Sequence, residues 1–422
     1  MKINRQDRNL FKNTLMLYVL QFSTYFFSFV TVPYQTRVLG PQIYGVLGVA
    51  IAVMMYFQLF MDFGFLLSAT EDISLRRDDK AYVSKKLTSV AIIKGMFTIL
   101  SFAVLMIICN FEPFSEYKTL YIVYLFAYAI NSFLPDYFFR GIENMFPVTI
   151  RTVSVKAFSC LMTFVLLRSK EDFLIVPILL LTGNLVAVVW AYIYIYRVLG
   201  YKVECVTIQQ VWNDLKRSSL FFLSRIATTV YSATNTIVLS LVDQTGSSTG
   251  FYTSADKVFS TAKSGISPVS DSLYPYMVKN KNFKMVKKVL LLLEPVIVAG
   301  CIVVFIFAEP ICGLVFGKEF VGTAPVLQAF VPVVAIILPS YILGFPTLGA
   351  MGLSKYANYS IFFGMSIHIL GLLMLTLKSN ISAVSLATMT SVSEISIMLF
   401  RLIVVVKNKN KFEENQKNAK NT

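Results

Sequence analysis

Seven basic side chains fall inside, or at the rims of, stretches that are otherwise apolar enough to cross a membrane: Arg37, Lys94, Lys156, Arg225, Lys257, Lys263 and Arg401. A charge at the centre of a bilayer costs roughly 2.5–3.5 kcal/mol on insertion scales unless it faces a wet cavity or an opposite charge. The chain is therefore predicted to line a hydrated internal space that holds something negative.

Carboxyl groups in the same apolar stretches are the second set of residues that could have a functional role. A desolvated carboxyl group can exchange a proton or ligate Na⁺. Four are candidates for ion coupling: Asp62, Asp256, Asp271 and Glu394. Asp256 and Asp271 could instead neutralise the lysines of their own helix, and both interpretations stay open. Glu394 is the preferred coupling residue, on about the same helix face as Arg401.

Polar residues in the stretch 250–277 recur at steps of three or four, which places them on one face of a helix. They are Tyr252, Asp256, Ser260, Lys263 and Ser267. The stretch 218–242 repeats the pattern from Arg225 to Asn235. Together with 10–33 and 42–67, these stretches are predicted to line the hydrated internal space. For Ser, Thr and Asn, hydrogen bonding between packed helices is the alternative.

The composition identifies the class of protein that must position these groups. The chain has 422 residues, of which 56% are hydrophobic and 14% charged, and its mean hydropathy is +0.67. Because a soluble domain carries about 25% charged residues, this is predicted to be an all-α polytopic membrane protein. The net charge of +15 does not indicate a nucleic-acid partner, because the basic residues follow the predicted membrane topology.

We predict about twelve spans of roughly 20 residues, the length that crosses a ~30 Å hydrocarbon layer. Their approximate limits are 10–33, 42–67, 86–109, 117–135, 148–167, 173–196, 218–242, 250–277, 288–308, 323–350, 355–377 and 381–406. With both termini in the cytoplasm, the inside connections and tail hold 26 Lys and Arg residues, and the outside connections hold five. The positive-inside rule favours this orientation, with contacts to anionic membrane lipids.

Four segments are predicted along the chain. Residues 1–200 form an N-terminal lobe with transmembrane helices 1–6, and 201–216 form a cytoplasmic linker with a short amphipathic helix around 206–215. Residues 217–406 form a C-terminal lobe with helices 7–12. The polar segment 407–422 is predicted to be a disordered cytoplasmic tail.

Enzyme chemistry is not indicated by any motif in the chain. There is no phosphate-binding loop, no nucleophile elbow and no His-metal cluster, so we expect no catalytic residues, no metal and no cofactor. The five cysteines share no metal-ligand spacing and are predicted to be packing residues. The single histidine, His368, is predicted to be buried and hydrogen-bonded.

Five short segments carry a resemblance to a known family: 37–45 (RVLGPQIYG), 62–65 (DFGF), 134–145 (LPDYFFRGIENM), 250–255 (GFYTSA) and 316–320 (FGKEF). The chain resembles the Wzx-type flippases for O-antigen and capsule repeat units, in the polysaccharide-export branch of the multidrug/oligosaccharidyl-lipid/polysaccharide (MOP) superfamily. It departs from that family's pattern at Glu71, Tyr137 and Arg140. The family commonly has a basic residue, Trp and Gln at these positions.

The resemblance implies two six-helix lobes in a MATE-like, V-shaped arrangement in the bacterial inner membrane. It implies translocation of an undecaprenyl-diphosphate-linked oligosaccharide by alternating access, driven by an H⁺ or Na⁺ gradient. Polysaccharide polymerase and ligase machinery would be its protein partners. The substrate-binding residues are then expected to be Arg37, Lys94, Lys156, Arg225, Lys257 and Lys263, with Arg140 as a contact where the substrate arrives from the cytoplasm.

Three alternatives differ in their expected sequence features. An H⁺- or Na⁺-coupled multidrug antiporter of the same superfamily would carry mostly acidic residues in its cavity, because most drugs are cations. A lipid II-type flippase would usually have two further helices. A glycosyltransferase or polymerase would usually carry a large external loop or a soluble domain.

Overall fold

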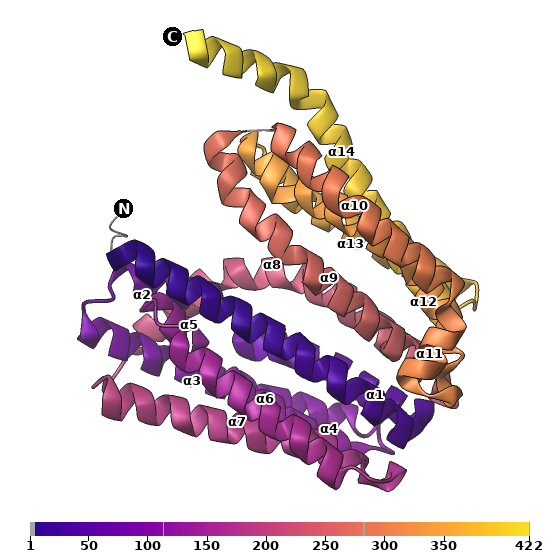
Figure 1. Ribbon diagram of the computed structural model, residues 1–422. Helices are drawn as coiled ribbons and strands as arrows, with labels where there is room; N and C mark the ends of the chain where they lie inside the picture. Colours follow the sequence, from indigo (N-terminus) through magenta and orange to yellow (C-terminus); the bar gives the residue numbers. More distant parts are fainter. Residues whose placement is uncertain (1–4, 113, 282, 422) are drawn as a thin grey trace. The chain divides into compact units, whose positions relative to one another are not determined.

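The computed structural model describes the backbone of residues 5–421 except 113 and 282. It describes their side chains except those of 5–12, 14, 220, 223, 224, 227, 228, 230–232, 275, 280 and 409–421. This part of the chain forms helices and contains no strand, which confirms the predicted all-α class (Figure 1). It divides into two compact units, Met1–Thr229 (unit 1) and Val230–Thr422 (unit 2).

Unit 1 is a bundle in which α1 packs against α3, α4 and α6, and α7 packs against α4 and α6. Its elements are α1 Arg5–Asp62, α2 Phe65–Leu75, α3 Lys80–Ile108, α4 Lys118–Ser132, α5 Asp136–Gly141, α6 Phe146–Leu166, η1 Lys170–Leu174, α7 Ile175–Ile193 and η2 Tyr194–Val198. Helix α8, Ile208–Ser240, begins in unit 1 and ends in unit 2.

Unit 2 is organised around α12, which packs against α9, α10 and α14, while α13 packs on α14. Its remaining elements are α9 Ser247–Asn280, α10 Phe283–Ile306, α11 Ala308–Phe316, η3 Lys318–Phe320, α12 Thr323–Ile342, η4 Leu343–Gly349, α13 Ser354–Leu377 and α14 Ala383–Asn421. The predicted tail over 407–422 falls mainly on residues whose side chains lie outside the described part, and it stays a prediction.

Nine stretches of the described residues are long and apolar enough to cross a membrane. One of them, Leu15–Leu75, covers both predicted spans 10–33 and 42–67. The polar helices α8 and α9 are not among the nine, because their stripes of charged and hydroxyl groups lower the hydropathy. A polytopic membrane protein is confirmed, but the count of about twelve spans is not.

Two local features explain where the long helices bend and where they continue. Within α1, Gly40 adopts φ 70° and ψ 170°, a left-handed backbone that glycine tolerates, and Pro41 follows it without an amide donor. The predicted turn between the first two spans therefore lies at Gly40. In contrast, no Gly or Pro interrupts the sequence from Ile208 to Ser240, and linker residues continue directly into the predicted seventh span as one helix. The boundaries of the predicted lobes and linker stay predictions.

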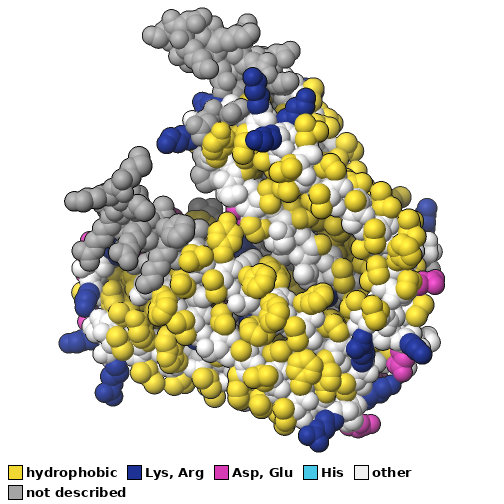
Figure 2. All heavy atoms as spheres, in the orientation of Figure 1, with side chains coloured by type: hydrophobic (Ala, Val, Ile, Leu, Met, Phe, Trp, Pro, Cys, Tyr) yellow, Lys and Arg dark blue, Asp and Glu magenta, His cyan; other side chains and the backbone are white. Residues whose placement is uncertain are grey.

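The outer side chains match a hydrocarbon environment. Hydrophobic side chains cover the visible flanks of the helices, while Lys and Arg gather near helix ends (Figure 2). All five cysteines are free thiols, and only Cys205 is exposed. Burial raises the pKa of the Cys312 thiol, in the short helix α11, to about 11. The cysteines are packing residues, as predicted, apart from Cys205 in the connection before α8.

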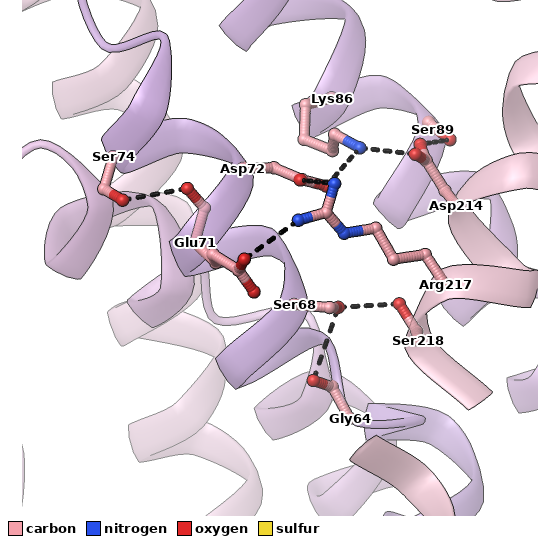
Figure 3. Close-up of polar contacts among 10 residues, drawn as sticks. All are labelled: Gly64, Ser68, Glu71, Asp72, Ser74, Lys86, Ser89, Asp214, Arg217 and Ser218. Carbon is pink, nitrogen blue, oxygen red and sulfur yellow. Dashed lines mark hydrogen bonds and ion pairs between the residues drawn. The ribbon is translucent and has the colours of Figure 1, made fainter. Parts of the chain in front are cut away.

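A charge cluster with a buried centre, Lys86 and Asp72, holds the first turns of α8 against α2 and α3 (Figure 3). We call Asp72, Lys86, Asp214 and Arg217 the α8 anchor. Lys86 Nζ lies 2.8 Å from Asp72 Oδ2 and also contacts Asp214 Oδ1, and Arg217 Nη1 lies 2.6 Å from Asp72 Oδ1. Two acids and two bases therefore neutralise one another at this junction.

The backbone of α8 also comes close to the connection between α1 and α2. Gly64, between α1 and α2, has φ 78°, and a Cβ there would lie 2.8 Å from the Cβ of Phe221 and 3.0 Å from the carbonyl oxygen of Ser218. The hydroxyl groups of Ser68 and Ser218 are 2.7 Å apart. Glycine is required both by this backbone angle and by the approach of α8.

Candidate functional site

A cavity of about 530 Å³ lies within unit 1 between α1, α4, α6 and α7. Its charged lining residues are Asp136, Arg151 and Lys156. Uncharged polar groups also line it, from α1 (Thr24, Ser28, Thr31, Gln35), α4 (Tyr124, Tyr128, Asn131) and α6 and α7 (Thr152, Ser159, Thr163, Asn184). A volume of this size is typical of small-molecule sites, which span about 300–1,000 Å³.

Helix α6 supplies both cations of the cavity. It starts at Phe146 with Pro147 in its first turn, where proline suits a helix. Thr152, Lys156, Ser159 and Thr163 follow at steps of four, three and four, so that they share one face. The Lys156 ammonium donates to Thr24 Oγ1 across 2.8 Å, which directs it toward α1.

The second cation, Arg151, is held by the start of α5. Its Nη2 donates to Asp136 Oδ1 at 2.7 Å, and 2% of the arginine side chain is exposed. The other walls are fixed by a hydrogen bond from Asn184 Nδ2 to the carbonyl of Ala127, 3.0 Å long, which joins α7 to α4. The cavity therefore carries two positive charges and one negative charge on helices that are fastened to each other.

A separate ion pair in unit 1 joins two residues that the sequence analysis assigned to different roles. Lys94 Nζ, predicted to bind substrate, lies 3.2 Å from Asp62 Oδ1, predicted to couple an ion. Lys94 is buried and also contacts the carbonyl oxygen of Ser132. The two residues act as one charge pair between α1 and α3.

Unit 2 also contains an ion pair between a predicted substrate-binding lysine and a predicted ion-coupling acid. Lys263 Nζ on α9 lies 2.7 Å from Glu394 Oε1 on α14. Arg401, predicted to lie on about the same helix face as Glu394, donates from Nε to Ser360 Oγ and from Nη1 to the carbonyl oxygen of Ser340, each at 2.8 Å. The acid that sequence analysis preferred for coupling is thus paired with a predicted substrate-binding lysine.

A hydrogen-bonded network is buried beside this pair. His368 Nε2 is 3.0 Å from Asn235 Oδ1, and His368 Nδ1 is 3.2 Å from Ser393 Oγ. Asn235 Nδ2 donates to the hydroxyl oxygens of Tyr252 and Thr390, each at 3.0 Å. The prediction of a buried, hydrogen-bonded histidine is confirmed.

The other predicted site residues lie in different surroundings. Arg37, Arg140, Lys257 and Asp271 are exposed, whereas Arg225 and Asp256 are half-buried. The predicted chamber walled by helices of both lobes stays a prediction, as do the substrate and coupling roles of these residues.

Sequence reasoning did not identify Arg151, Asp136 and Tyr124 as members of a cavity. Arg151 was counted only as one of the 26 basic residues of the inside connections and tail that favour the predicted orientation. The available signal was the polar stripe of α6 from Thr152 to Thr163, which has the same periodicity as the stripes on 218–242 and 250–277.

The fold and the site define a multi-pass helical membrane protein with a cationic cavity among its helices. Residues 10–281 match the model of a family described as polysaccharide biosynthesis protein. Two relatives bear the description "Putative O-antigen transporter". One, from Shigella dysenteriae, is 27% identical over 370 residues, which are 85% of this chain and 91% of the relative. The other, from Escherichia coli K12, is 26% identical over 69% of this chain and 70% of its own length.

Solved structures share the fold. A lipid II flippase, MurJ, in an inward closed conformation matches with a TM-score of 0.68 at 17% identity, covering 96% of this chain and 90% of its own. An inward-facing multidrug resistance MATE transporter of the MOP superfamily matches with a TM-score of 0.69 at 11% identity, covering 91% and 96%. The chain belongs to the polysaccharide biosynthesis protein family and shares the fold of these two structures.

Proposed function

We propose that this protein moves an undecaprenyl-diphosphate-linked oligosaccharide from the cytoplasmic to the outer leaflet of the bacterial inner membrane. The exported repeat unit would serve surface polysaccharide synthesis. Alternating access of the two units, coupled to an H⁺ or Na⁺ gradient, would drive the step with both termini in the cytoplasm. The O-antigen transporter description of the two relatives and the fold shared with a lipid II flippase support this proposal.

The observation that carries the proposal is the cationic cavity of unit 1. A diphosphate-linked glycan is anionic and hydrophilic, so it cannot cross ~30 Å of hydrocarbon without a polar path. Lys156 and Arg151 can replace part of the hydration of an anionic group, and the hydroxyl and amide side chains around them can bond to sugar hydroxyls. A multidrug antiporter is less well supported, because cationic drugs would be repelled by this lining.

The remaining predicted residues keep their proposed roles in two groups. The substrate-contacting group beyond the cavity is Arg37, Lys94, Arg140, Arg225, Lys257 and Lys263, and the ion-coupling group is Asp62, Asp256, Asp271 and Glu394. The pairs Lys94–Asp62 and Lys263–Glu394 suggest how the groups could communicate, because an anion near the lysine competes with the carboxylate for it.

The test is to delete the gene for this protein in its own host cell and then to complement the deletion. Deletion should abolish surface polymer and leave the lipid-linked repeat unit on the cytoplasmic leaflet, and the wild-type chain should restore export. Lys156→Met should reduce surface polymer at least tenfold at an unchanged amount of membrane-inserted protein. The matched control is Lys85→Met, at an exposed position of α3, which should export normally.

A deletion strain that still displays normal polymer would refute the proposal. Full export by Lys156→Met would show that the cavity is not needed for export, and it would not contradict the flippase function itself.

A further inference from the structure

Helix α10 of unit 2 carries a single acid, Glu294, at its centre. Glu294 is the twelfth of the 24 residues of this helix. Of the nine stretches that could cross a membrane, α10 is the most apolar and the least covered by the rest of the protein, with 6% of its most apolar part buried. A helix of this length spans a ~30 Å hydrocarbon layer at ~1.5 Å per residue, so Glu294 lies near the middle of the layer.

The carboxyl group of Glu294 has no partner among the residues that the structure describes. The side chain is half-buried, and its Oε2 atom is buried without a hydrogen bond. No described lysine or arginine forms an ion pair with it. By contrast, the acids Asp62, Asp136 and Glu394 each lie within 3.2 Å of a lysine or arginine nitrogen. Glu294 differs from them because no base balances its negative charge.

The neighbouring helices turn apolar faces toward α10. Helix α12 packs on α10 and contains no acid or base, and Tyr341 is its only titratable residue. Helix α9 lines a cavity of about 350 Å³ together with α10 and α12, through Val258, Ala262 and Ile266. At about 100° per residue, the charged residues in the middle of α9 lie on its other faces; they are Asp256, Lys257, Lys263 and Asp271.

The remaining titratable groups lie along α10 itself and on α11. Lys287, which is exposed, and Cys301 are on the same side of α10 as Glu294, each two turns or about 10 Å along the axis. The other lysines of α10 lie on different faces: Lys284 and Lys288. Helix α11 begins beyond α10 and carries the exposed Glu309 and the buried Cys312. An ionised Glu294 would therefore have no counter-charge in contact with it.

The next residue, Pro295, leaves an acceptor for a proton on Glu294. Proline has no amide hydrogen, so the carbonyl oxygen of Leu291 lacks the helical donor that residue 295 would otherwise supply. A protonated carboxyl group has a hydroxyl donor, whereas a carboxylate only accepts hydrogen bonds. Polar side chains can bond to backbone carbonyl groups one turn earlier in a helix. Because a carboxylate is far more costly in hydrocarbon than a neutral acid, these surroundings favour the protonated form.

We propose that Glu294 is a proton-binding site of unit 2, protonated in the conformation of this structure and exchanging its proton with water during transport. A Na⁺ ion would need several oxygen ligands. The cavity next to Glu294 is lined by apolar side chains, two glycines and Cys301 and supplies no such ligand. The helix is least constrained at Pro295, where a change of bend would bring water to the carboxyl group. The proton site rests on the position of Glu294 alone, and its part in driving transport rests on the proposed function.

The proton site is tested by labelling the full chain in lipid nanodiscs with dicyclohexylcarbodiimide, an apolar reagent that adds to protonated carboxyl groups. Peptide mass spectrometry locates the adduct. We expect Glu294 to be labelled to within twofold the same extent at pH about 5 and pH about 8, whereas labelling of the exposed Glu309 should fall at least tenfold, because an ordinary Glu ionises near pH 4. Glu309→Gln is the control and should leave labelling of Glu294 unchanged.

A missing adduct on Glu294 at pH about 8 overturns the proton site. An equally steep loss of labelling at Glu294 and Glu309 between the two pH values overturns it as well.

Two variants test the exchange of the proton during transport. Glu294→Gln keeps the size of the side chain but cannot release a proton, and should reduce surface polymer at least tenfold in the complemented deletion strain. Glu294→Asp is shorter but keeps a titratable group, and should export more polymer than Glu294→Gln. A carboxyl group with only a packing role would give the reverse order, because Gln preserves its shape better than Asp does. Size-exclusion chromatography and the amount of membrane-inserted protein check the fold of each variant.

Glu309→Gln is again the control and should export normally. Full export by Glu294→Gln, or more export by Glu294→Gln than by Glu294→Asp, overturns the role in transport. If Glu294 is labelled as described but deletion of the gene leaves polymer export intact, the proposed function is wrong and the proton site is still supported.

Discussion

The α8 anchor offers a quantitative test of how strongly buried charge fastens the helix shared by the two units. Lys86 is 7% exposed and lies between Asp72, which is 5% exposed, and Asp214, which is 15% exposed. Lys86→Met keeps most of the length of the side chain and removes its charge. Asp72 then depends on Arg217, and Asp214 retains a hydrogen bond of 2.6 Å from Ser89.

The expected loss of stability follows from the negative charge that Lys86→Met leaves without its lysine partner. Removing one partner of a buried ion pair typically destabilises a protein by about 3–5 kcal/mol, because the remaining charge has no compensation. Replacing both partners is much less costly. We therefore expect Lys86→Met to lower the free energy of unfolding by about 3–5 kcal/mol, and the double variant Lys86→Met/Asp214→Asn to recover at least half of that loss.

The measurement is SDS-induced unfolding of the full chain in mixed micelles, followed by tryptophan fluorescence. Both tryptophans, Trp190 and Trp212, lie in unit 1, and Trp212 is on the first part of α8. The control is Arg77→Met, which breaks an exposed ion pair to Glu143 of 2.9 Å, with side chains 44% and 62% exposed. An exposed pair contributes at most about 1 kcal/mol.

Two results would refute this reasoning. Lys86→Met could prove no more damaging than Arg77→Met, in which case the anchor would contribute little to stability. Alternatively, the double variant could be less stable than Lys86→Met, in which case the hydrogen bonds of Asp214 would matter more than its charge.

Three further outcomes can be measured on the same preparations. Lys263→Met should destabilise unit 2 by about 2–4 kcal/mol by removing the lysine partner of buried Glu394, and adding Glu394→Gln should restore most of the loss. Equal stability of the single and double variants would contradict the pairing. A membrane-impermeant maleimide should label Cys205, the one exposed cysteine, in inside-out vesicles and not in intact spheroplasts; labelling in spheroplasts would reverse the predicted orientation. Gly364→Ala should cost about 1–3 kcal/mol, since its Cβ would lie 2.4 Å from an isoleucine of α14, whereas Gly95→Ala, with open space around it, should be neutral or stabilising in the same unfolding assay.

The sequence predicted the helices well because hydrophobic length is a local property. It also placed the break of α1, since a left-handed glycine followed by proline is a local signal. The two least apolar helices, α8 and α9, were predicted from the periodicity of their polar residues and not from hydropathy alone. The continuity of α8 through the predicted linker could also have been read from the absence of Gly and Pro between residues 208 and 240.

The partners of the charged residues could not be predicted in this way. Periodicity assigns Lys263 to a helix face, but its partner Glu394 is 131 residues further along the chain. Lys94 and Asp62 were assigned separate roles for the same reason. Arg151 was overlooked because a basic residue near a helix start fits the topology rule, and only the packing of α1, α4, α6 and α7 places it in a cavity.

Asp136 presents a further question, because a carboxylate in a site for anions should weaken their binding. A transporter, however, must release its cargo as well as hold it, and the carboxylate both orients Arg151 and reduces the net charge of the cavity. Asp136→Asn keeps the size and an acceptor oxygen while removing the negative charge. At an effective dielectric constant of about 20, a charge about 6 Å from the ligand, across the guanidinium group that both would share, contributes about 3 kcal/mol. We expect Asp136→Asn to bind an anionic sugar such as D-glucuronate at least tenfold more tightly and to export less polymer, because release becomes slower. Weaker binding of the anionic sugar would show that Asp136 acts mainly by holding Arg151 in place, and tighter binding with undiminished export would show that release from this cavity does not limit transport.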